Sequence, residues 1–209
     1  YRGGWETASS DVLIIPDQTD LTTGGFKAVA AAKADALGEA FHAFMASIPS
    51  LPPLGEGTPA IQEKSRQLWE KVAARCLAGF LDPGDVINIG AAGLTPAVMV
   101  DRGQAFVEWC RREFGVSPSE WIVEAAVSGP ANAAIGGTWR GRIDLAFVAR
   151  AGVLAGRRVL VDHKAVMAGS RECVTKSGEY LGEVTAYAEA LSGTALPGLS
   201  LIHISEPTR

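Results

Sequence analysis

The spacing of apolar residues divides the chain into segments with a helical period and shorter segments typical of strands. In four segments, apolar residues recur every three or four positions, which indicates helices with one buried face. These predicted helices cover residues 26–48, 62–80, 96–114 and 177–191. Three short apolar runs between the third and fourth helices predict strands. They cover residues 121–127, 139–150 and 158–166. This order predicts an α/β fold with a mixed sheet flanked by helices.

Proline and glycine mark most of the expected boundaries. Residues 49–60 are rich in both and predict a linker, and Pro83-Gly84 is expected to end the second helix. Thr95-Pro96 has the form of an N-cap followed by a proline in the first helical position. Gly115 then predicts the end of that helix.

Composition indicates a folded globular chain. The sequence has 209 residues, of which 47% are hydrophobic and 20% charged. That is enough for one core and an appended subdomain. No apolar run approaches the roughly 20 residues of a membrane span. The three cysteines form no Cys-x-x-Cys pair, so neither a zinc site nor a disulfide framework is expected, and a reducing, cytoplasmic setting fits best.

The candidate chemistry lies in two of the predicted strands. Asp162, His163 and Lys164 follow an apolar run, and Asp144 lies within another. Side chains alternate along a strand, so Asp162 and Lys164 are expected to share one face. Burying a charge is unfavourable unless it is paired or bound to a metal. A strand-end salt bridge is the simpler alternative for Asp-x-Lys alone; the second carboxylate, Asp144, favours a site.

Further residues become candidates only in combination with those of the two strands. Glu124 is a carboxylate in the otherwise apolar first strand, and His42 lies at the edge of an apolar helical stripe. Glu183 and Tyr187 are four apart on the last predicted helix, hence on one side of it. Net charge is −4, but residues 105–209 hold 11 Lys/Arg against 11 Asp/Glu, and Arg142 is among the cations around the suspect strands.

In this order the residues resemble the RecB-like branch of the PD-(D/E)XK nucleases, and most closely the C-terminal nuclease module of AddA-type, UvrD-like helicase-nucleases. The five motifs of that family are matched as Gly38–His42, Glu124, Gly141–Asp144, Asp162–Lys164 and Glu183–Tyr187. The resemblance implies a restriction-endonuclease-like core with an N-terminal helical segment. The nuclease domain would span residues 35–198, with a helical insertion at about 62–115 and a connecting segment at 1–34.

The resemblance also implies roles for these residues. The metal ligands would be His42, Asp144, Asp162 and the main-chain carbonyl of His163, around Mg²⁺ or Mn²⁺. Hard oxygen ligands suit either ion. Lys164 would act with both aspartates in catalysis, and Glu124 would support the metal site. The residues expected to contact DNA are Arg142, Glu183 and Tyr187. Glu183 departs from the usual glutamine of the family, and a carboxylate cannot donate a hydrogen bond.

The function implied is a Mg²⁺-dependent deoxyribonuclease, an exonuclease rather than an endonuclease, within an ATP-dependent helicase-nuclease of double-strand break repair. Its expected partners are DNA, an upstream helicase domain and an AddB-type subunit, with no membrane. No Gly-x-x-x-x-Gly-Lys-Ser/Thr motif occurs, so no ATP site of that type is expected on this piece. The alternatives are a catalytically silent nuclease-fold scaffold that binds DNA or a partner, and a stand-alone repair or restriction endonuclease.

Both ends of the chain are unusual. It begins at Tyr1 with no signal-peptide pattern, so we expect an internal piece of a longer protein. Residues 199–209 resemble the translation of a transposon-end adapter used in preparing sequencing libraries. Such a tail would not have been selected to pack here. The alternative is a native strand, because Leu199, Leu201, Ile202 and Ile204 favour one. Even an adapter-derived tail could add an edge strand, and we expect its deletion to change stability little.

Overall fold

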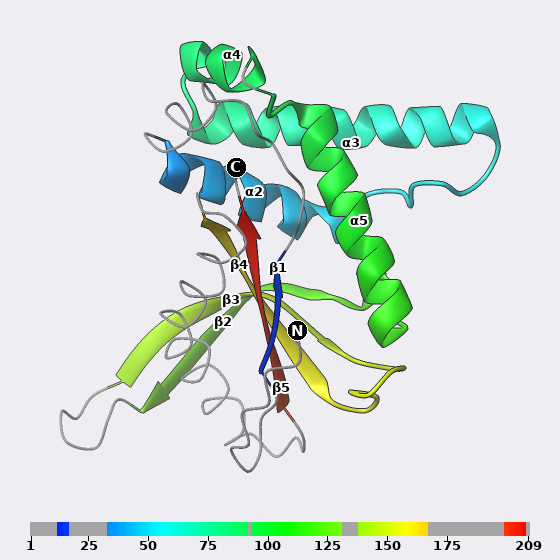
Figure 1. Cartoon of the computed structure of the whole chain (residues 1–209), viewed down its shortest axis with the longest axis vertical. Helices are drawn as coiled ribbons and strands as arrows, with labels where there is room; N and C mark the ends of the chain where they lie inside the picture. Colours follow the sequence, from blue (N-terminus) through cyan, green and yellow to red (C-terminus); the bar gives the residue numbers. More distant parts are fainter. Residues whose placement is uncertain (1–11, 17–32, 92, 131–137, 167–198, 208–209) are drawn as a thin grey trace.

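A computed structural model describes residues 12–16, 33–91, 93–130, 138–166 and 199–207. Helices lie together over one side of a five-stranded sheet (Figure 1). The helices are α2 (Ala34–Ser47), α3 (Pro59–Phe80), α4 (Pro83–Ala91) and α5 (Pro96–Phe114), with short 3₁₀ helices η1 (Ile48–Ser50) and η2 (Pro118–Glu120). The strands are β1 (Val12–Pro16), β2 (Ile122–Pro130), β3 (Thr138–Val148), β4 (Arg158–Val166) and β5 (Leu199–Pro207). The helix predicted at 177–191 lies outside the described residues.

Helix α5 begins and ends where its sequence predicts. The Thr95 hydroxyl accepts a hydrogen bond from the Val98 N–H, and Pro96 takes the first helical position. Gly115 ends the helix in the left-handed region, with φ of 66°. A Cβ there would also lie 2.9 Å from the Cβ of Ala151, so glycine is required twice over. Helix α3 begins at Pro59, inside the predicted linker.

The expected role of Pro83-Gly84 is wrong. Helix α3 has already ended at Phe80, and Pro83 begins a separate helix, α4. Proline is well tolerated in the first turn of a helix, where its missing N–H has no partner to lose. The Val86 N–H bonds to the carbonyl of Asp82, which closes the first turn around the proline.

The sheet is mixed, with the order β1-β5-β4-β3-β2. Strands β2, β3 and β4 pair antiparallel, whereas β5 runs parallel to both β4 and β1. The segment 1–34 therefore contributes a strand to the sheet. The tail strand β5 is interior, between β1 and β4, and the expectation of an edge strand is wrong. In that register Ile202 pairs with Val161 on one side and with Leu13 on the other.

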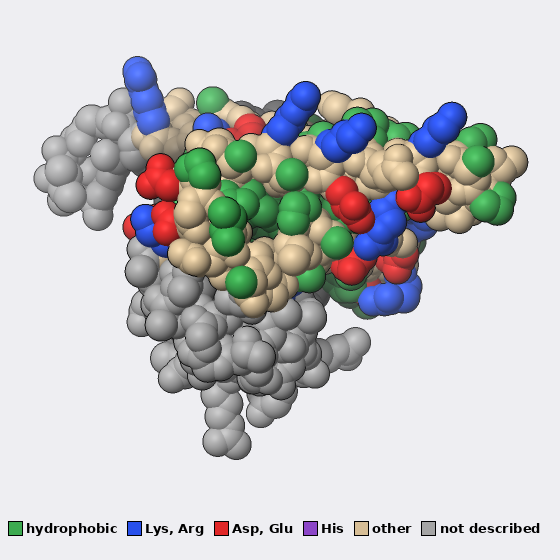
Figure 2. Space-filling view, turned by 90° about the horizontal axis from the view of Figure 1, so that it is seen from above, with side chains coloured by type: hydrophobic (Ala, Val, Ile, Leu, Met, Phe, Trp, Pro, Cys, Tyr) green, Lys and Arg blue, Asp and Glu red, His purple; other side chains and the backbone are tan. Residues whose placement is uncertain are grey.

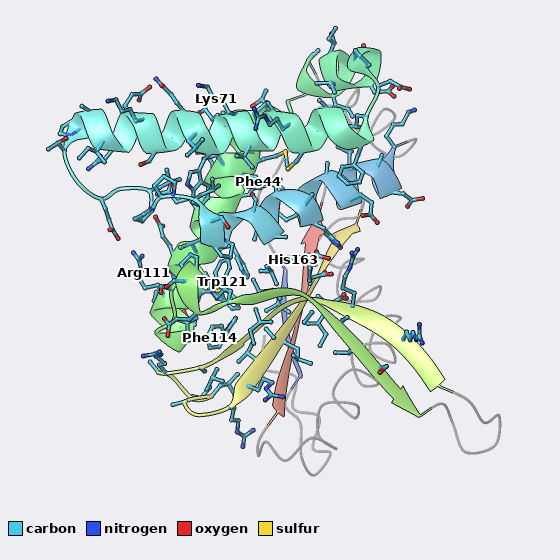
Figure 3. All side chains as sticks on the ribbon, turned by 180° about the vertical axis from the view of Figure 1, so that it is seen from behind. Phe44, Lys71, Arg111, Phe114, Trp121 and His163 are labelled. Atoms are coloured by element: carbon cyan, nitrogen blue, oxygen red, sulfur yellow. The ribbon has the colours of Figure 1, made fainter. Side chains whose placement is uncertain are left out.

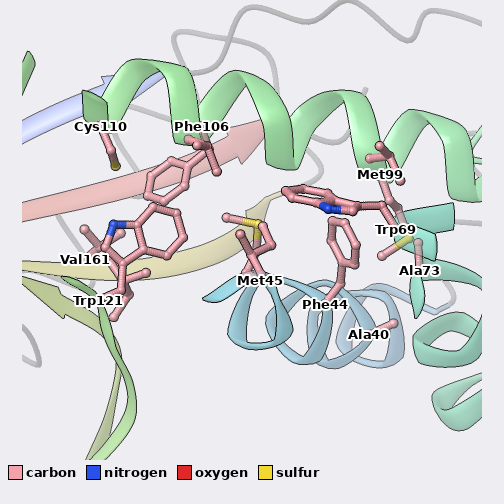
Figure 4. Close-up of a cluster of buried hydrophobic side chains, with 14 of the residues drawn as sticks. Ala40, Phe44, Met45, Trp69, Ala73, Met99, Phe106, Cys110, Trp121 and Val161 are labelled. Atoms are coloured by element: carbon pink, nitrogen blue, oxygen red, sulfur yellow. The ribbon is translucent and has the colours of Figure 1, made fainter. Parts of the chain in front are cut away.

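The core lies between the helices and one face of β3 and β4. Leu145 and Val161 are paired across the two strands and are both buried in this cluster. Phe44 of α2 packs edge-on against Trp69 of α3, with ring centroids 6.0 Å apart (Figure 4). Cys110 of α5 is buried here as a free thiol, and burial raises the pKa of Cys110 well above its ordinary value. A buried thiol of this kind acts as a small apolar core residue.

Within the described residues, no helix is both long enough and apolar enough to span a membrane.

Two glycines provide a test of the helix packing. A Cβ at Gly103 of α5 would lie 2.9 Å from the ring of Phe44 and 3.1 Å from Ile48, whereas one at Gly79 of α3 would meet nothing within 4 Å. We expect Gly103→Ala to lower the free energy of unfolding by about 1–3 kcal/mol through overpacking. Gly79→Ala should raise it by up to about 1 kcal/mol through helix propensity. Urea unfolding of both variants measures this; equal effects of the same sign would contradict the packing.

The interior position of β5 gives a second test. A chain ending at Gly198 would leave β1 and the end of β4 without the strand that pairs with them. We expect that chain to lose cooperative thermal unfolding by circular dichroism, because unpaired main-chain groups and apolar surface would be exposed together. The control ends at Pro207 and should melt like the full chain. Identical melting of the Gly198 chain would instead support a dispensable tail.

Candidate functional site

The candidate site lies where β3 separates from β4. The two strands pair through four rungs, the last joining Leu145 to Val161. The next residues along the two strands are Asp144 and Asp162, and the β3–β4 register does not extend to them. Strand β4 keeps its other neighbour, because β5 stays in register with it as far as Val166. The β3–β4 ladder therefore ends at the residues that the sequence singles out.

Two side chains take the place of the missing strand partner. The His163 N–H donates to Asp144 Oδ2 over 2.7 Å, and His42 Nε2 donates to the His163 carbonyl over 2.5 Å. The N–H and C=O of one strand residue point the same way, so β3 would have bonded to both had it continued. Asp144 comes from β3 and His42 from α2. Three of the four predicted ligands, His42, Asp144 and the His163 carbonyl, thus meet here, whereas no described contact joins Asp162 to them.

The same contacts define a space between His42 and Asp144. Because a carbonyl can only accept, Nε2 is the donor to His163, and Nδ1 is the ring nitrogen left as a possible metal ligand. That Nδ1 lies 3.7 Å from Asp144 Oδ1. Two ligands of one Mg²⁺ ion, each about 2.1 Å from it, lie about 3.0–4.2 Å apart. The spacing and the donor types of this pair therefore fit a divalent cation.

The imidazole of His163 has a separate, structural role. It is 2% exposed and lies edge-on to the rings of Phe106 and Phe41, at centroid distances of 5.2 and 6.0 Å. Figure 3 places it beneath α2, where the strands converge. These aromatic contacts fix the strand whose main chain bonds to His42. Neither phenylalanine was predicted as a site residue, although Phe41 directly precedes His42 in the apolar stripe of α2.

Asp162 and Lys164 lie on β4 beside this opening. Asp162 is buried, with 5% exposure, and its register partner on β5 is His203. Lys164 is in register with Ser205. In the described part of the chain, no three His, Cys, Asp or Glu side chains are placed to hold one metal ion. The candidate ligands that lie close together are the side chains of His42 and Asp144 and the main-chain carbonyl of His163.

Glu124 lies at an irregular point of the adjoining hairpin. It has φ of 54°, an uncommon value for a residue other than glycine. The β2–β3 pairs skip it, and Asp144 is the residue across the ladder. Its Oε2 accepts from Arg142 Nε at 2.7 Å. Glu124 is thus held by an arginine of β3. The other predicted DNA contacts, Glu183 and Tyr187, lie outside the described residues.

Comparison with known proteins adds no family to this geometry. The chain matches no protein-family model, and it matches no curated protein.

The hydrogen bond to His163 predicts different effects for two substitutions of Asp144. Asp144→Ala leaves a main-chain N–H without its acceptor in a site where the carboxylate is only 12% exposed. We expect that change to lower the free energy of unfolding by about 1–3 kcal/mol. Asp144→Asn keeps an oxygen acceptor and should cost clearly less. Equal losses in urea unfolding would show that the hydrogen bond does not hold the strands at this point.

Proposed function

We propose that the chain is the nuclease module of a helicase-nuclease and cleaves DNA with the help of Mg²⁺ or Mn²⁺. The observation that carries this proposal is the convergence of Asp144, His42 and the His163 main chain at the point where β3 leaves β4. These three come from distant parts of the sequence. Their meeting supports the resemblance to the PD-(D/E)XK nucleases and a restriction-endonuclease-like core.

The residues that would hold the ion are His42, Asp144 and Asp162, with the carbonyl of His163. This carbonyl already accepts from His42, but a carbonyl oxygen has a second lone pair. A divalent ion bound there would polarise the scissile phosphate and lower the pKa of a bound water. Carboxylate, carbonyl and imidazole groups are a donor set that suits Mg²⁺ or Mn²⁺.

The chain's own residues would supply the rest of the chemistry. Lys164, two residues after Asp162 on β4, would orient the attacking water and stabilise the negative charge that builds on the phosphate. Asp144 would keep its hydrogen bond to the His163 N–H, which fixes its carboxylate while the second oxygen faces His42. The buried packing of the His163 ring keeps this main chain in place. An exonuclease acting in double-strand break repair, in the cytoplasm, with an AddB-type partner, is the form of this activity that we propose.

One observation favours a second candidate, a nuclease-fold module that binds DNA without cutting it. The described part of the chain lacks a group of three His, Cys, Asp or Glu side chains placed to hold an ion. The two candidates differ in their dependence on metal. Labelled single- and double-stranded DNA incubated with Mg²⁺, Mn²⁺, Ca²⁺ or EDTA separates them. Cleavage with Mg²⁺ or Mn²⁺ alone supports the nuclease; DNA binding with no cleavage under any condition supports the silent module.

Lys164 gives the sharpest mutational prediction. If it stabilises the transition state, Lys164→Ala should lower turnover by on the order of 100-fold or more. The Mg²⁺-induced rise in melting temperature should remain, because that rise depends on the ligands. Lys71→Ala, at an exposed position on α3 (Figure 3), is the matched control and should have wild-type turnover. A lower melting temperature with unchanged turnover would instead support the simpler interpretation, in which Lys164 forms a strand-end salt bridge.

A further inference from the structure

The β2–β3 hairpin has one face on which cations lead toward Asp144. Arg140 and Arg142 precede Asp144 by four and two residues on β3, and residues two apart share a face of a strand. Both arginines are exposed. Successive side chains on that face are about 6.8 Å apart, close to the separation of neighbouring phosphates in a polynucleotide. The hairpin projects from the body of the molecule, below the helices in Figure 1.

Small residues lie opposite these arginines. The register pairs Arg142 with Ala126 and Arg140 with Ser128, and paired residues of an antiparallel ladder share one face. Both small residues are exposed, so no bulky side chain of β2 covers the arginines. Among the described residues of the hairpin, the acidic side chains are those of Glu124 and Asp144, both at the end nearest the opening. The face is therefore cationic along its length and acidic at the candidate site.

Glu124 orients the nearer arginine. Its carboxylate contacts Arg142 through Nε, and a guanidinium has four further N–H donors on its Nη atoms. Arg142 is 64% exposed, whereas Glu124 is 30% exposed. The left-handed backbone of Glu124 is unfavourable for a residue with a Cβ, so the surrounding sheet must hold it, and its carboxylate starts from a fixed main chain.

We propose that this face of the hairpin, Arg140 with Arg142, is the track that binds the phosphate backbone of a polynucleotide and leads it to Asp144. Glu124 is a positioning residue that holds Arg142 for a phosphate, and it is not a metal ligand. The inference rests on the proposed function, because the track ends at the site proposed to cut. The polynucleotide would therefore follow β3 and would not contact the outer face of the helices. In Figure 2 some lysines and arginines of that helical face are separated by apolar and uncharged surface, and others lie beside acidic side chains.

The experiment measures binding of the full chain to a fluorescent single-stranded oligonucleotide in EDTA, by anisotropy, across a salt series. Each phosphate contact contributes about 0.7 to the slope of log affinity against log salt for single strands. Arg140→Gln and Arg142→Gln should each weaken binding and flatten that slope by about this amount. Arg75→Gln, at an exposed position on α3 without a described ion pair, controls for Arg140. Arg112→Gln controls for Arg142, because Arg112 is 68% exposed and bonds a carboxylate through Nε at 2.8 Å. If the two control variants weaken binding and flatten the slope as much as Arg140→Gln and Arg142→Gln do, the proposed track is wrong.

The sign of the Glu124→Gln effect tests the positioning role. Removing a negative charge should by itself tighten binding to DNA, whereas loss of the group that holds Arg142 should weaken it. We expect weaker binding that disappears when Arg142→Gln is already present, with an unchanged melting temperature and an unchanged Mg²⁺ requirement for cleavage. Tighter binding, or a raised Mg²⁺ requirement independent of Arg142, overturns this role.

The outcome for the wild type separates the two proposals. If the wild type cleaves DNA and all variants have the same salt slope, the nuclease proposal stands and the proposed track is wrong. If DNA binding depends on Arg140 and Arg142 but no cleavage occurs, the proposed track stands and the nuclease proposal is wrong. A wild-type chain that neither binds nor cuts DNA overturns both.

Discussion

The candidate site depends on one main-chain requirement, the need of His163 for hydrogen-bond partners after β3 has separated from β4. A buried N–H or C=O without a partner costs about 1–3 kcal/mol, so the gap between the strands must be filled. Asp144 fills it on the N–H side and His42 on the carbonyl side. The groups suited to chemistry are therefore also the groups that hold the opening in shape. This double role joins α2 to the sheet and makes the site part of the fold.

The helical layer supports this arrangement at a distance. His42 reaches the carbonyl of His163 only because α2 lies firmly against β4. Phe44 and Met45, which follow His42 on that helix, are fully buried in the core with Trp69. Gly103 of α5 allows the ring of Phe44 to approach closely. Packing in the core thus fixes the distance between His42 and Asp144, and a loss of volume there would alter the site without touching either residue.

Local sequence patterns correctly predicted the bounds of those elements that depend on nearby residues alone. The bounds of β4 agree with the apolar run Arg158–Val166, and Thr95 and Gly115 delimit α5 as expected. The order of motifs also singled out His42 and Asp144 as candidates, and these two side chains lie 3.7 Å apart, from Nδ1 to Oδ1. What could not be predicted depends on contacts between distant segments. The interior place of β5 is set by its partners β1 and β4, and the pocket around the His163 ring is set by Phe106 on another helix. Pro83-Gly84 was misjudged because proline starts a helix as readily as it ends one.

The irregular residue Glu124 has a mechanical consequence. The β2–β3 register is the same on both sides of it, since Val123 pairs with Leu145 and Ala125 with Ile143. No residue is inserted, so the ladder is interrupted without being shifted. The angle between the outer hairpin and the body of the sheet is therefore set at one residue, with every rung on either side still paired. Rotation there would carry the arginines of β3 as a rigid arm and leave His42, Asp144 and His163 where they are.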